Sequence, residues 1–488
     1  MLKLNRPEFP PLRLKALAAS TVLATALLGA CAAAPLPPGT WDARAAPVVE
    51  VVRDGDRWTA DYVFNRDAQV WAFMDSALMT DVRQPWRPTQ WTVETPGVVM
   101  ERRGHYDVIR SLDGGPVPRH VRFSIKPKAV YLEAEYGTLT FSDGAVALPI
   151  RQFDVFALPS VEAAEAMPAD LNGVDLEGGA STVTWRDTAG PVLFNGKRQT
   201  KLTTTGERSY VLLGQARVTP GEGLTTVIDP NLPPWIREEI RSFAPHVGDY
   251  YLRRLGAPGV GSETSTVMVS WNGPTERLSS MGGSVLPGLI VMNFEGVGVL
   301  NPTQQVLERS RWFIGHESAH FWLGQAVRYE FARDAWITEG GADLMAVRAL
   351  KALDPAYDDR AELQTEVNDC IDLGRKSVAD AGDRGEHRAY YACGAVFAMA
   401  AEGAQKRRDG GDWFDFLRPV LATNREDGVL SRVEWLDALT RVSGDPSLAE
   451  SIERMLDQGA ADPAAEIASL FRRTGVPHRV ENGRVVLI

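Results

Sequence analysis

The sequence predicts a multidomain protein in which an N-terminal antiparallel β domain precedes an α+β domain that ends in helices. Three observations support this prediction. The chain has 488 residues, which is too many for a single hydrophobic core. Segments of alternating polarity, separated by Asp-Gly and Asn-Gly turns, fill residues 48–232. Helical periodicity dominates after residue 301. We therefore expect an antiparallel β domain over 48–232, an α+β domain over 233–405 and a helical region over 406–488.

Composition and charge exclude several classes of protein. Hydrophobic residues make up 44% of the chain and charged residues 24%, as is usual for a folded globular protein. The net charge of −11 argues against a nucleic-acid-binding protein, because binding to phosphates requires an excess of Lys and Arg. Three cysteines are too few for a disulfide-stapled miniprotein or a cysteine-built metal cluster.

The first 30 residues predict an export signal. Residues 16–30 are uncharged and apolar, and the stretch before them is basic, with Lys3, Arg6, Arg13 and Lys15. The segment Leu28-Gly29-Ala30-Cys31 resembles the lipobox of bacterial lipoproteins. The resemblance implies a lipoprotein signal peptide over 1–30, lipidation of Cys31, and an Ala/Pro-rich tether over 31–47. Ala32, which is not an aspartate, implies sorting to the outer membrane, facing the periplasm. An ordinary signal peptide with a chance cysteine is the alternative.

Within the β region, residues 120–125 and 129–134 alternate in polarity and are predicted as strands. A segment rich in proline, 229–234, then separates the two patterns. A helix follows from Ile236 to Leu255, with a kink or break expected at Pro245. Two strands, 264–271 and 289–294, precede the helices 302–323, 338–352, 359–376, 388–407 and 411–421. A terminal hairpin is expected over 479–488 around Asn482-Gly483.

The strongest functional motif is His316-Glu317-Ser318-Ala319-His320. On a helix, histidines at positions i and i+4 share one face and can bind the same metal ion. Asn301 is expected to cap this helix at its start, and Gly324 to end it.

A third ligand follows 18 residues after His320, at Glu339. Two histidines and one glutamate leave the fourth position of a tetrahedral Zn²⁺ open, which is typical of catalytic zinc rather than structural zinc. The two cysteines that remain after signal cleavage, Cys370 and Cys393, are expected either to form a disulfide or to be buried as thiols.

The spacing of these motifs resembles the gluzincin aminopeptidases of the membrane alanyl aminopeptidase family, which are related to glycyl aminopeptidases. The resemblance implies a thermolysin-like zinc domain over 233–405 and a peptide substrate. It also implies that Asp343 holds a ligand histidine. In the segment Tyr390-Tyr391-Ala392-Cys393-Gly394, it implies that Tyr391 donates a hydrogen bond to the oxyanion that forms during hydrolysis.

Together the motifs predict a zinc metallopeptidase, aminopeptidase-like, that hydrolyses peptide bonds through a zinc-bound water. Zinc held by His316, His320 and Glu339 would lower the pKa of that water. Glu317 would accept its proton and return it to the leaving amine.

One position departs from the family pattern. The family aminopeptidases carry Gly-x-Met-Glu-Asn before the zinc helix, and its glutamate binds the free amino terminus of the substrate. Here that glutamate is replaced by Val285, within residues 282–286. Another acid, such as Glu276 or Glu295, could supply the anchor. Otherwise the enzyme is an endopeptidase that needs no free amino terminus, or it hydrolyses another amide or an epoxide. A non-catalytic peptide-binding or assembly lipoprotein on a peptidase scaffold is a further alternative.

Overall fold

The computed structural model describes residues 46–220, 224–258, 265–276 and 280–488. The predicted signal peptide, Cys31 and nearly all of the predicted tether lie outside the described residues. Among the described residues, no helix combines the length and the apolar character needed to cross a membrane.

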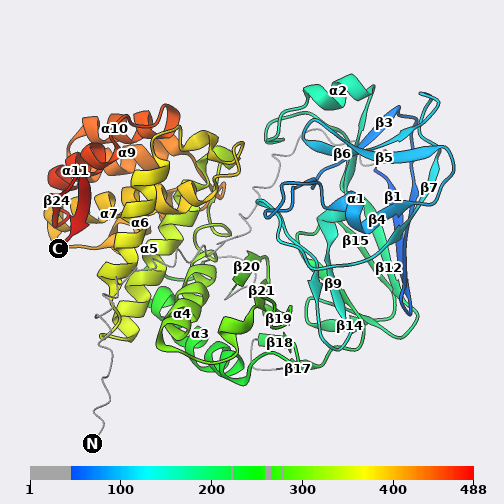
Figure 1. Ribbon diagram of the computed structural model, residues 1–488, viewed down its shortest axis with the longest axis horizontal. Helices are drawn as coiled ribbons and strands as arrows, with labels where there is room; N and C mark the ends of the chain where they lie inside the picture. Colours follow the sequence, from blue (N-terminus) through cyan, green and yellow to red (C-terminus); the bar gives the residue numbers. More distant parts are fainter. Residues whose placement is uncertain (1–45, 221–223, 259–264, 277–279) are drawn as a thin grey trace, which may run out of the picture.

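The N-terminal part consists of three sheets and two short helices (Figure 1). The six-stranded sheet has the order β15 (Leu202–Thr205), β12 (Thr182–Asp187), β1 (Val48–Asp54), β2 (Arg57–Val63), β7 (His120–Ile125) and β4 (Trp91–Val93). One five-stranded sheet has the order β11 (Glu177–Gly179), β10 (Val155–Leu158), β3 (Val70–Phe73), β6 (Tyr106–Ser111) and β5 (Val98–Arg103). The other has the order β14 (Lys197–Gln199), β13 (Val192–Phe194), β16 (Tyr210–Leu213), β9 (Val146–Pro149) and β8 (Leu139–Thr140). The helices are α1 (Arg87–Gln90) and α2 (Val161–Ala166).

Strand pairing in these three sheets is antiparallel, as predicted, except that β1 and β12 pair in parallel. Because successive side chains of a strand point to opposite faces of the sheet, every second residue of β2 is buried. These residues are Trp58, Ala60 and Tyr62. The predicted turns at Asp54-Gly55 and Asn195-Gly196 join β1 to β2 and β13 to β14.

The segment 129–134, predicted as a strand, is a loop in the structure. Pro127 follows the end of β7 and has no N–H group to continue a ladder. Ala134 has a positive φ of 54°, which an extended strand does not allow. The carboxylate of Glu135 holds the end of the loop by accepting hydrogen bonds from the backbone N–H groups of Ser76 (2.8 Å) and Ala77 (2.9 Å).

A fourth sheet begins the second part of the molecule. Its order is β17 (Val218–Pro220), β18 (Leu224–Ile228), β19 (Ser265–Trp271), β21 (Leu289–Glu295) and β20 (Ser280–Leu286). The predicted boundary at residue 232 is therefore too late, because β17 and β18 pair with this sheet rather than with the β domain. The edge strand β20 was not predicted, since its Gly282-Gly283 pair and its serines are poor strand formers.

Helices make up most of the rest of the chain: α3 (Pro234–Leu255), α4 (Gln304–Ala319), α5 (Trp336–Leu353), α6 (Asp359–Leu373), α7 (Arg388–Asp409), α8 (Trp413–Thr423), α9 (Arg432–Ser443), α10 (Pro446–Asp457) and α11 (Pro463–Thr474). Two small sheets join them: β22 (Arg328–Tyr329) with β23 (Val429–Leu430), and the predicted terminal hairpin of β24 (His478–Glu481) and β25 (Arg484–Leu487). Helix α3 continues through Pro245 without a break. Pro245 is exposed, so water can satisfy the carbonyl that its missing N–H leaves free.

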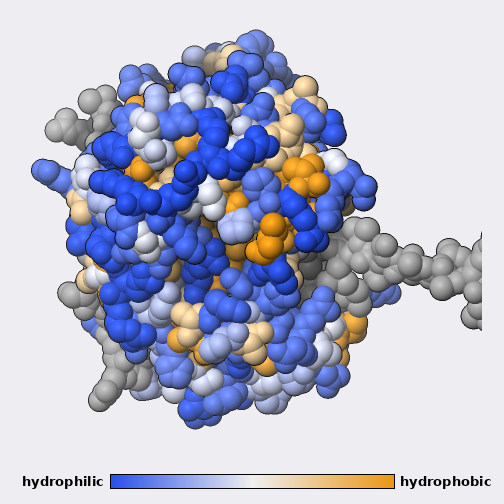
Figure 2. Space-filling model, turned by 90° about the vertical axis from the view of Figure 1, so that its left-hand side faces the viewer, coloured by the Kyte–Doolittle hydropathy of each residue, from blue (hydrophilic) through white to orange (hydrophobic). Residues whose placement is uncertain are grey.

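The helical part is built around one hydrophobic core, which extends from Leu232 to Leu487. The C-terminal helices therefore share a core with α4 and α5, and no core boundary falls at the predicted division between residues 405 and 406. The outer face of this part is mainly hydrophilic, with scattered hydrophobic side chains (Figure 2). The helices thus form a single body that carries the predicted motifs in its interior.

Candidate metal centre

The two histidines of the motif lie at the end of α4 and face α5, which carries Glu339. The Nε2 atoms of His316 and His320 are 3.0 Å apart. Each lies 3.5 Å from Oε2 of Glu339. All three side chains are buried. Each offers one possible metal-binding atom, and these three atoms lie within 4.8 Å of one another. The structure thus brings together the three residues predicted as metal ligands.

The helix that carries the motif is shorter than predicted. It begins after Thr303, whose side chain accepts a hydrogen bond from the N–H of Val306 (3.3 Å), so Asn301 is not the cap. It ends at Ala319 rather than near Gly324. Beyond this point the N–H of Gln325 donates to the carbonyl of His320, five residues earlier (3.0 Å), whereas an α-helix bonds residues four apart. His320 keeps helical dihedral angles as the C-cap residue. The i, i+4 relation of the two histidines therefore survives.

Hydrogen bonds at Nδ1 fix the orientation of both imidazole rings. Nδ1 of His316 lies 2.8 Å from Oδ1 of Asp343, and Nδ1 of His320 lies 2.8 Å from the carbonyl oxygen of Leu323. When Nδ1 donates in each pair, the lone pair of each Nε2 is left to bind a cation. Asp343 thus holds a predicted ligand histidine, as the sequence suggested.

The residues present fit a zinc ion. Two imidazole nitrogens and a carboxylate oxygen are ordinary zinc donors, and donors at about 2.0–2.2 Å from a tetrahedral zinc lie about 3.3–3.6 Å from one another. The observed separations of 3.0 and 3.5 Å are close to these values. Moreover, both carboxylate oxygens of Glu339 are buried without a hydrogen-bond partner among the described residues. A cation at this point would stabilise a buried carboxylate in that condition.

The electrostatics of the centre favour a positive charge. Burial lowers the pKa of His316, but its hydrogen bond with Asp343 and the nearby Glu339 and Glu317 raise it by more, to about 10. Burial raises the pKa of Glu339, but His320 and His316 lower it by more, so the net shift is downward. The cluster of acids therefore stabilises a cation at the point where the two Nε2 atoms converge.

Glu317 lies beside the three ligands and against the edge strand of the sheet. A Cβ atom on Gly283 of β20 would lie 2.5 Å from Cδ of Glu317, so only glycine allows the carboxyl group this position. Burial raises the pKa of Glu317, while His316 and His320 oppose the increase. A carboxyl group with a raised pKa is suited to accepting and then releasing a proton near neutral pH.

Tyr391 reaches the centre from α7. Its ring is buried and stacks on the ring of His316, with centroids 5.8 Å apart. This position depends on a close crossing of α5 and α7, where a Cβ atom on Gly340 would lie 2.1 Å from the carbonyl carbon of Gly394. The close approach of the two glycines lets α7 bring Tyr391 against His316.

The position at which the family carries a glutamate holds Val285. Gly283 and Val285 are two residues apart on β20, so both face Glu317 and the helix α4. Val285 is buried. Glu295 is paired with Ser280 in the ladder, five residues from Val285 and thus about 16 Å along the strand. Its carboxylate accepts a hydrogen bond from Thr275 (2.7 Å), and Glu276 is exposed. Glu295 therefore does not take the position of the missing glutamate.

The β domain closes one side of this region. A cavity of about 50 Å³ lies between the loop that contains Tyr131 and Glu135 and the strand segment Gly282–Ser284. Gly283 therefore separates this cavity from Glu317. A small space at the junction of the two parts thus adjoins the candidate centre.

Sequence reasoning missed His387, which immediately precedes α7. Both of its ring nitrogens are buried without a hydrogen-bond partner among the described residues. Burial and the nearby Arg83 lower the pKa of His387, and Glu339 acts in the opposite direction. His387 is a single histidine outside any motif, so nothing in the sequence singled it out.

The two cysteines of the helical part lie on α6 and α7. Cys370 and Cys393 are joined by a disulfide in the structure, and both are fully buried. Cys393 is two residues from Tyr391. The bond fastens the helix that carries Tyr391 to its neighbour.

Comparison with known proteins gives similarities of fold. No model of a protein family matches the chain, and no curated protein sequence matches it. A mutant M1 zinc metallopeptidase from Deinococcus radiodurans, solved with the substrate Tyr-Ser-Ala, is 14% identical, with a TM-score of 0.45 over 85% of this chain and 94% of its own. Yeast LTA4 hydrolase, solved in its native form and with bestatin, is 13% identical, with a TM-score of 0.47 over 86% of this chain and 68% of its own. At these identities and TM-scores, the comparisons assign no activity to this chain.

Proposed function

We propose that this chain is a zinc-dependent peptidase of the gluzincin type. The observation that carries the proposal is the convergence of His316, His320 and Glu339 on one point, with Glu317 beside them. Two histidines and a glutamate leave room for a fourth ligand, which is typical of catalytic zinc. A protein that only binds peptides has no use for a buried carboxyl group at the position of Glu317.

When bound, zinc lowers the pKa of a coordinated water and polarises a substrate carbonyl. The residues of the chain supply the remaining steps. The Glu317 carboxylate accepts a proton from the attacking water and delivers it to the nitrogen of the leaving amine. The Tyr391 hydroxyl donates a hydrogen bond to the oxyanion that develops at the substrate carbonyl. Asp343 holds the ring of His316 in the orientation that binds metal.

The edge strand β20 favours a peptide as the substrate. It is the last strand of its sheet, and no other described strand pairs with its outer side. An extended peptide can bind to such an edge through main-chain hydrogen bonds. Because Gly283 of this strand contacts Glu317, a peptide bound there would pass beside the proposed proton acceptor.

The proposal is tested with Glu317→Gln. We expect this variant to bind one zinc ion per chain, as the wild type does, because none of the three ligands is changed. We expect turnover of peptides to fall by about 10²–10⁴-fold, the usual contribution of a general base. Metal analysis and single-turnover hydrolysis measure the two quantities separately. Near-normal turnover, or less than half an equivalent of zinc in the reconstituted wild type, would contradict the proposal.

Val285 favours a second candidate within the same chemistry: a peptidase that does not require a free amino terminus. Valine cannot pair with a protonated amine, whereas a carboxylate in a water-poor site binds one strongly. We expect matched free and N-acetylated peptides to differ by less than about 100-fold in kcat/KM. A larger preference for the free amine would show that another acid acts as the anchor and that the enzyme is an aminopeptidase.

We also propose that the protein is lipid-anchored in the bacterial cell envelope, at the outer membrane facing the periplasm. The support is the sequence Leu28-Gly29-Ala30-Cys31 after an apolar segment. Each buried CH₂ of an acyl chain contributes about 0.8 kcal/mol to membrane binding. We expect Cys31→Ser to move the protein from the membrane fraction to the soluble fraction, and unchanged fractionation would contradict the anchor.

A further inference from the structure

A partly buried arginine, whose side chain is 23% exposed, lies behind the carboxylate that orients His316. Asp343 uses Oδ1 to bind His316, and its Oδ2 has no hydrogen-bond partner among the described residues. That oxygen lies 3.9 Å from Nη1 of Arg388. The side chain of Asp343 is 1% exposed, so the nearby guanidinium compensates a charge that water cannot reach.

Arg388 is itself held firmly by two acids of a neighbouring helix. Its Nη2 donates to Oε1 of Glu366 at 2.7 Å, and its Nε donates to Oδ2 of Asp369 at 2.8 Å. Arg388 is the first residue of α7, Glu366 and Asp369 lie on α6, and Asp343 lies on α5. One guanidinium therefore connects three helices and fixes its own position relative to Asp343.

The charge of Arg388 is permanent. Burial lowers its pKa, but Glu366 and Asp343 raise it by more, and the net shift is upward. Asp343 thus has a fixed positive charge on the side opposite His316. Since the geometry of Asp343 sets the ring of His316, the arginine acts on the metal ligand through one intermediate residue.

We infer that Arg388 is a positioning residue for the metal centre: it orients the Asp343 carboxylate and, through it, the Nε2 atom of His316. The inference rests on the proposed function, because it assumes that His316 binds zinc. Arg388 contacts no predicted ligand directly. Loss of Arg388 is therefore expected to weaken zinc binding, although all three ligands remain in the chain.

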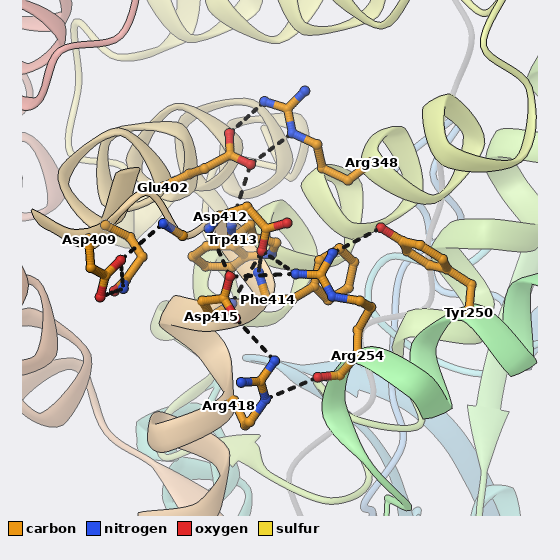
Figure 3. Close-up of polar contacts among 12 residues, drawn as sticks. Tyr250, Arg254, Arg348, Glu402, Asp409, Asp412, Trp413, Phe414, Asp415 and Arg418 are labelled. Carbon is orange, nitrogen blue, oxygen red and sulfur yellow. Dashed lines mark hydrogen bonds and ion pairs between the residues drawn. The ribbon is translucent and has the colours of Figure 1, made fainter. Parts of the chain in front are cut away.

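The chain offers a matched control in Arg348, which joins the same three helices at another place. Figure 3 shows its contact with Glu402. Arg348 lies on α5 and donates to Glu402 of α7 at 2.8 and 2.5 Å and to Asp359 of α6 at 3.0 Å. No contact links it to Asp343 or to the ligands among the described residues. Removing either arginine breaks a comparable bridge between α5, α6 and α7, but only the loss of Arg388 affects Asp343.

The experiment compares Arg388→Met, Arg348→Met and wild type, each as the full chain. Zinc affinity is measured by competition with a chromophoric chelator, and thermal unfolding is followed in parallel. We expect both variants to unfold at lower temperature. We expect only Arg388→Met to bind zinc more weakly, by about 10- to 100-fold. Arg388→Lys retains the charge but not the planar fork, so an intermediate affinity is expected.

Each outcome decides the inference. Equal zinc affinity of Arg388→Met and wild type, or equal weakening in Arg348→Met, would overturn it, because Arg388 would then be only structural. If Arg388→Met does not fold, wild-type affinity in Arg388→Lys would overturn it. Absence of zinc binding by the wild type would overturn both this inference and the proposed function. Zinc binding without hydrolysis of peptides would overturn the proposed function alone.

Discussion

Among single residues, Gly283 decides where the carboxyl group of Glu317 can lie. Gly283 has no Cβ, and the carboxyl group of Glu317 occupies the space that a Cβ would take. The added atom would lie 2.5 Å from Cδ and 2.7 Å from Oε1 of Glu317, well inside van der Waals contact. The edge strand thereby helps to fix the proposed proton acceptor in place.

We therefore expect Gly283→Ala to displace Glu317 while leaving the three ligands intact. A displacement on the order of 1 Å can reduce turnover by about 100-fold. The measurements are kcat and zinc content. Gly248→Ala is the control, because nothing lies within 4 Å of a Cβ at Gly248. Wild-type kcat in Gly283→Ala would show that Glu317 is not positioned by this strand.

The sequence predicted the site residues that belong to recognisable motifs. His316 and His320 share a helix face by the i, i+4 rule, whereas Glu339 was predicted from its spacing after His320 and Asp343 from the family resemblance. Gly283 and Arg388 could not be predicted in this way. Their importance comes from contacts with Glu317 and Asp343 that only the packing of separate elements creates. No local pattern distinguishes such a glycine or arginine from the others in the chain.

At the scale of elements, the crossing of α5 and α7 decides where Tyr391 lies. A Cβ on Gly394 would meet the carbonyl oxygen of Trp336 at 2.3 Å. The helices could accept it only by moving apart.

We expect Gly394→Ala to lower stability by about 1–3 kcal/mol, as overpacking usually does, and to lower kcat because Tyr391 moves away from His316. Gly403→Ala is the control on the same helix, because its Cβ would meet Cγ2 of Val476 at 2.8 Å. Gly403 is twelve residues beyond Tyr391 on α7, about 18 Å along the helix axis. Thermal unfolding and steady-state kinetics are measured for both variants. We expect both to lose stability and only Gly394→Ala to lose kcat, and equal kinetic effects would contradict the role of the crossing.

The disulfide between Cys370 and Cys393 joins α6 to α7 close to the same helix region. A cross-link that closes a loop of this length stabilises the folded state by about 3 kcal/mol in the chain-entropy description. We expect the double variant Cys370→Ala/Cys393→Ala to unfold at a correspondingly lower denaturant concentration. In the wild type, neither thiol is expected to react with a labelling reagent after denaturation without reductant. Complete labelling under those conditions would show that the bond is not formed.

Sequence periodicity predicted the long helices well and the edge strand poorly. Strong apolar spacing located α5 and α7 to within two residues at either end. Strand β20 escaped because its sequence, Ser280–Leu286, holds two glycines and two serines and has its place only through pairing with β21. Long-range pairing of this kind outweighs local propensity. The strand that lies against Glu317, β20, was therefore not predicted from the sequence.

At the scale of the whole molecule, the division into parts follows tertiary pairing rather than a change of pattern along the chain. Strands β17 and β18 look like a continuation of the β domain. However, β17 pairs with β18 and β18 pairs with β19, so both belong to the fourth sheet. Apolar residues from both sides of this boundary also pack together: Tyr136 and Leu212 lie in one cluster with Met268 and Leu289. The two parts thus meet in a continuous apolar contact, next to the cavity that adjoins Gly283.

The β domain also carries buried acids whose ionisation affects the stability of the molecule. Asp154 is 3% exposed, and its Oδ1 accepts a hydrogen bond from the N–H of Ser181 at 2.8 Å. Burial raises the pKa of Asp154 from its ordinary 3.8 to about 7, and the bond from Ser181 and the charge of Arg151 only partly oppose this increase. Between these two pH values, the unfolded chain has lost the proton and the folded chain keeps it. Ionisation therefore favours unfolding, and stability falls as the pH rises through this range.

We expect Asp154→Asn to remove this contribution, because the amide keeps an oxygen for Ser181 and cannot ionise. The difference between wild type and variant is expected to grow from pH 4 to pH 7, to at most on the order of 4 kcal/mol. Urea unfolding of the zinc-loaded full chain at several pH values gives the free energy of unfolding directly. Asp113→Asn is the control, since exposed Asp113 also accepts a backbone hydrogen bond, from Gly115. If Asp154→Asn retained the wild-type loss of stability between pH 4 and 7, then Asp154 is ionised in the folded protein. Its charge would then be balanced by Arg151, and the buried acids of the β domain would stabilise the molecule at neutral pH rather than weaken it.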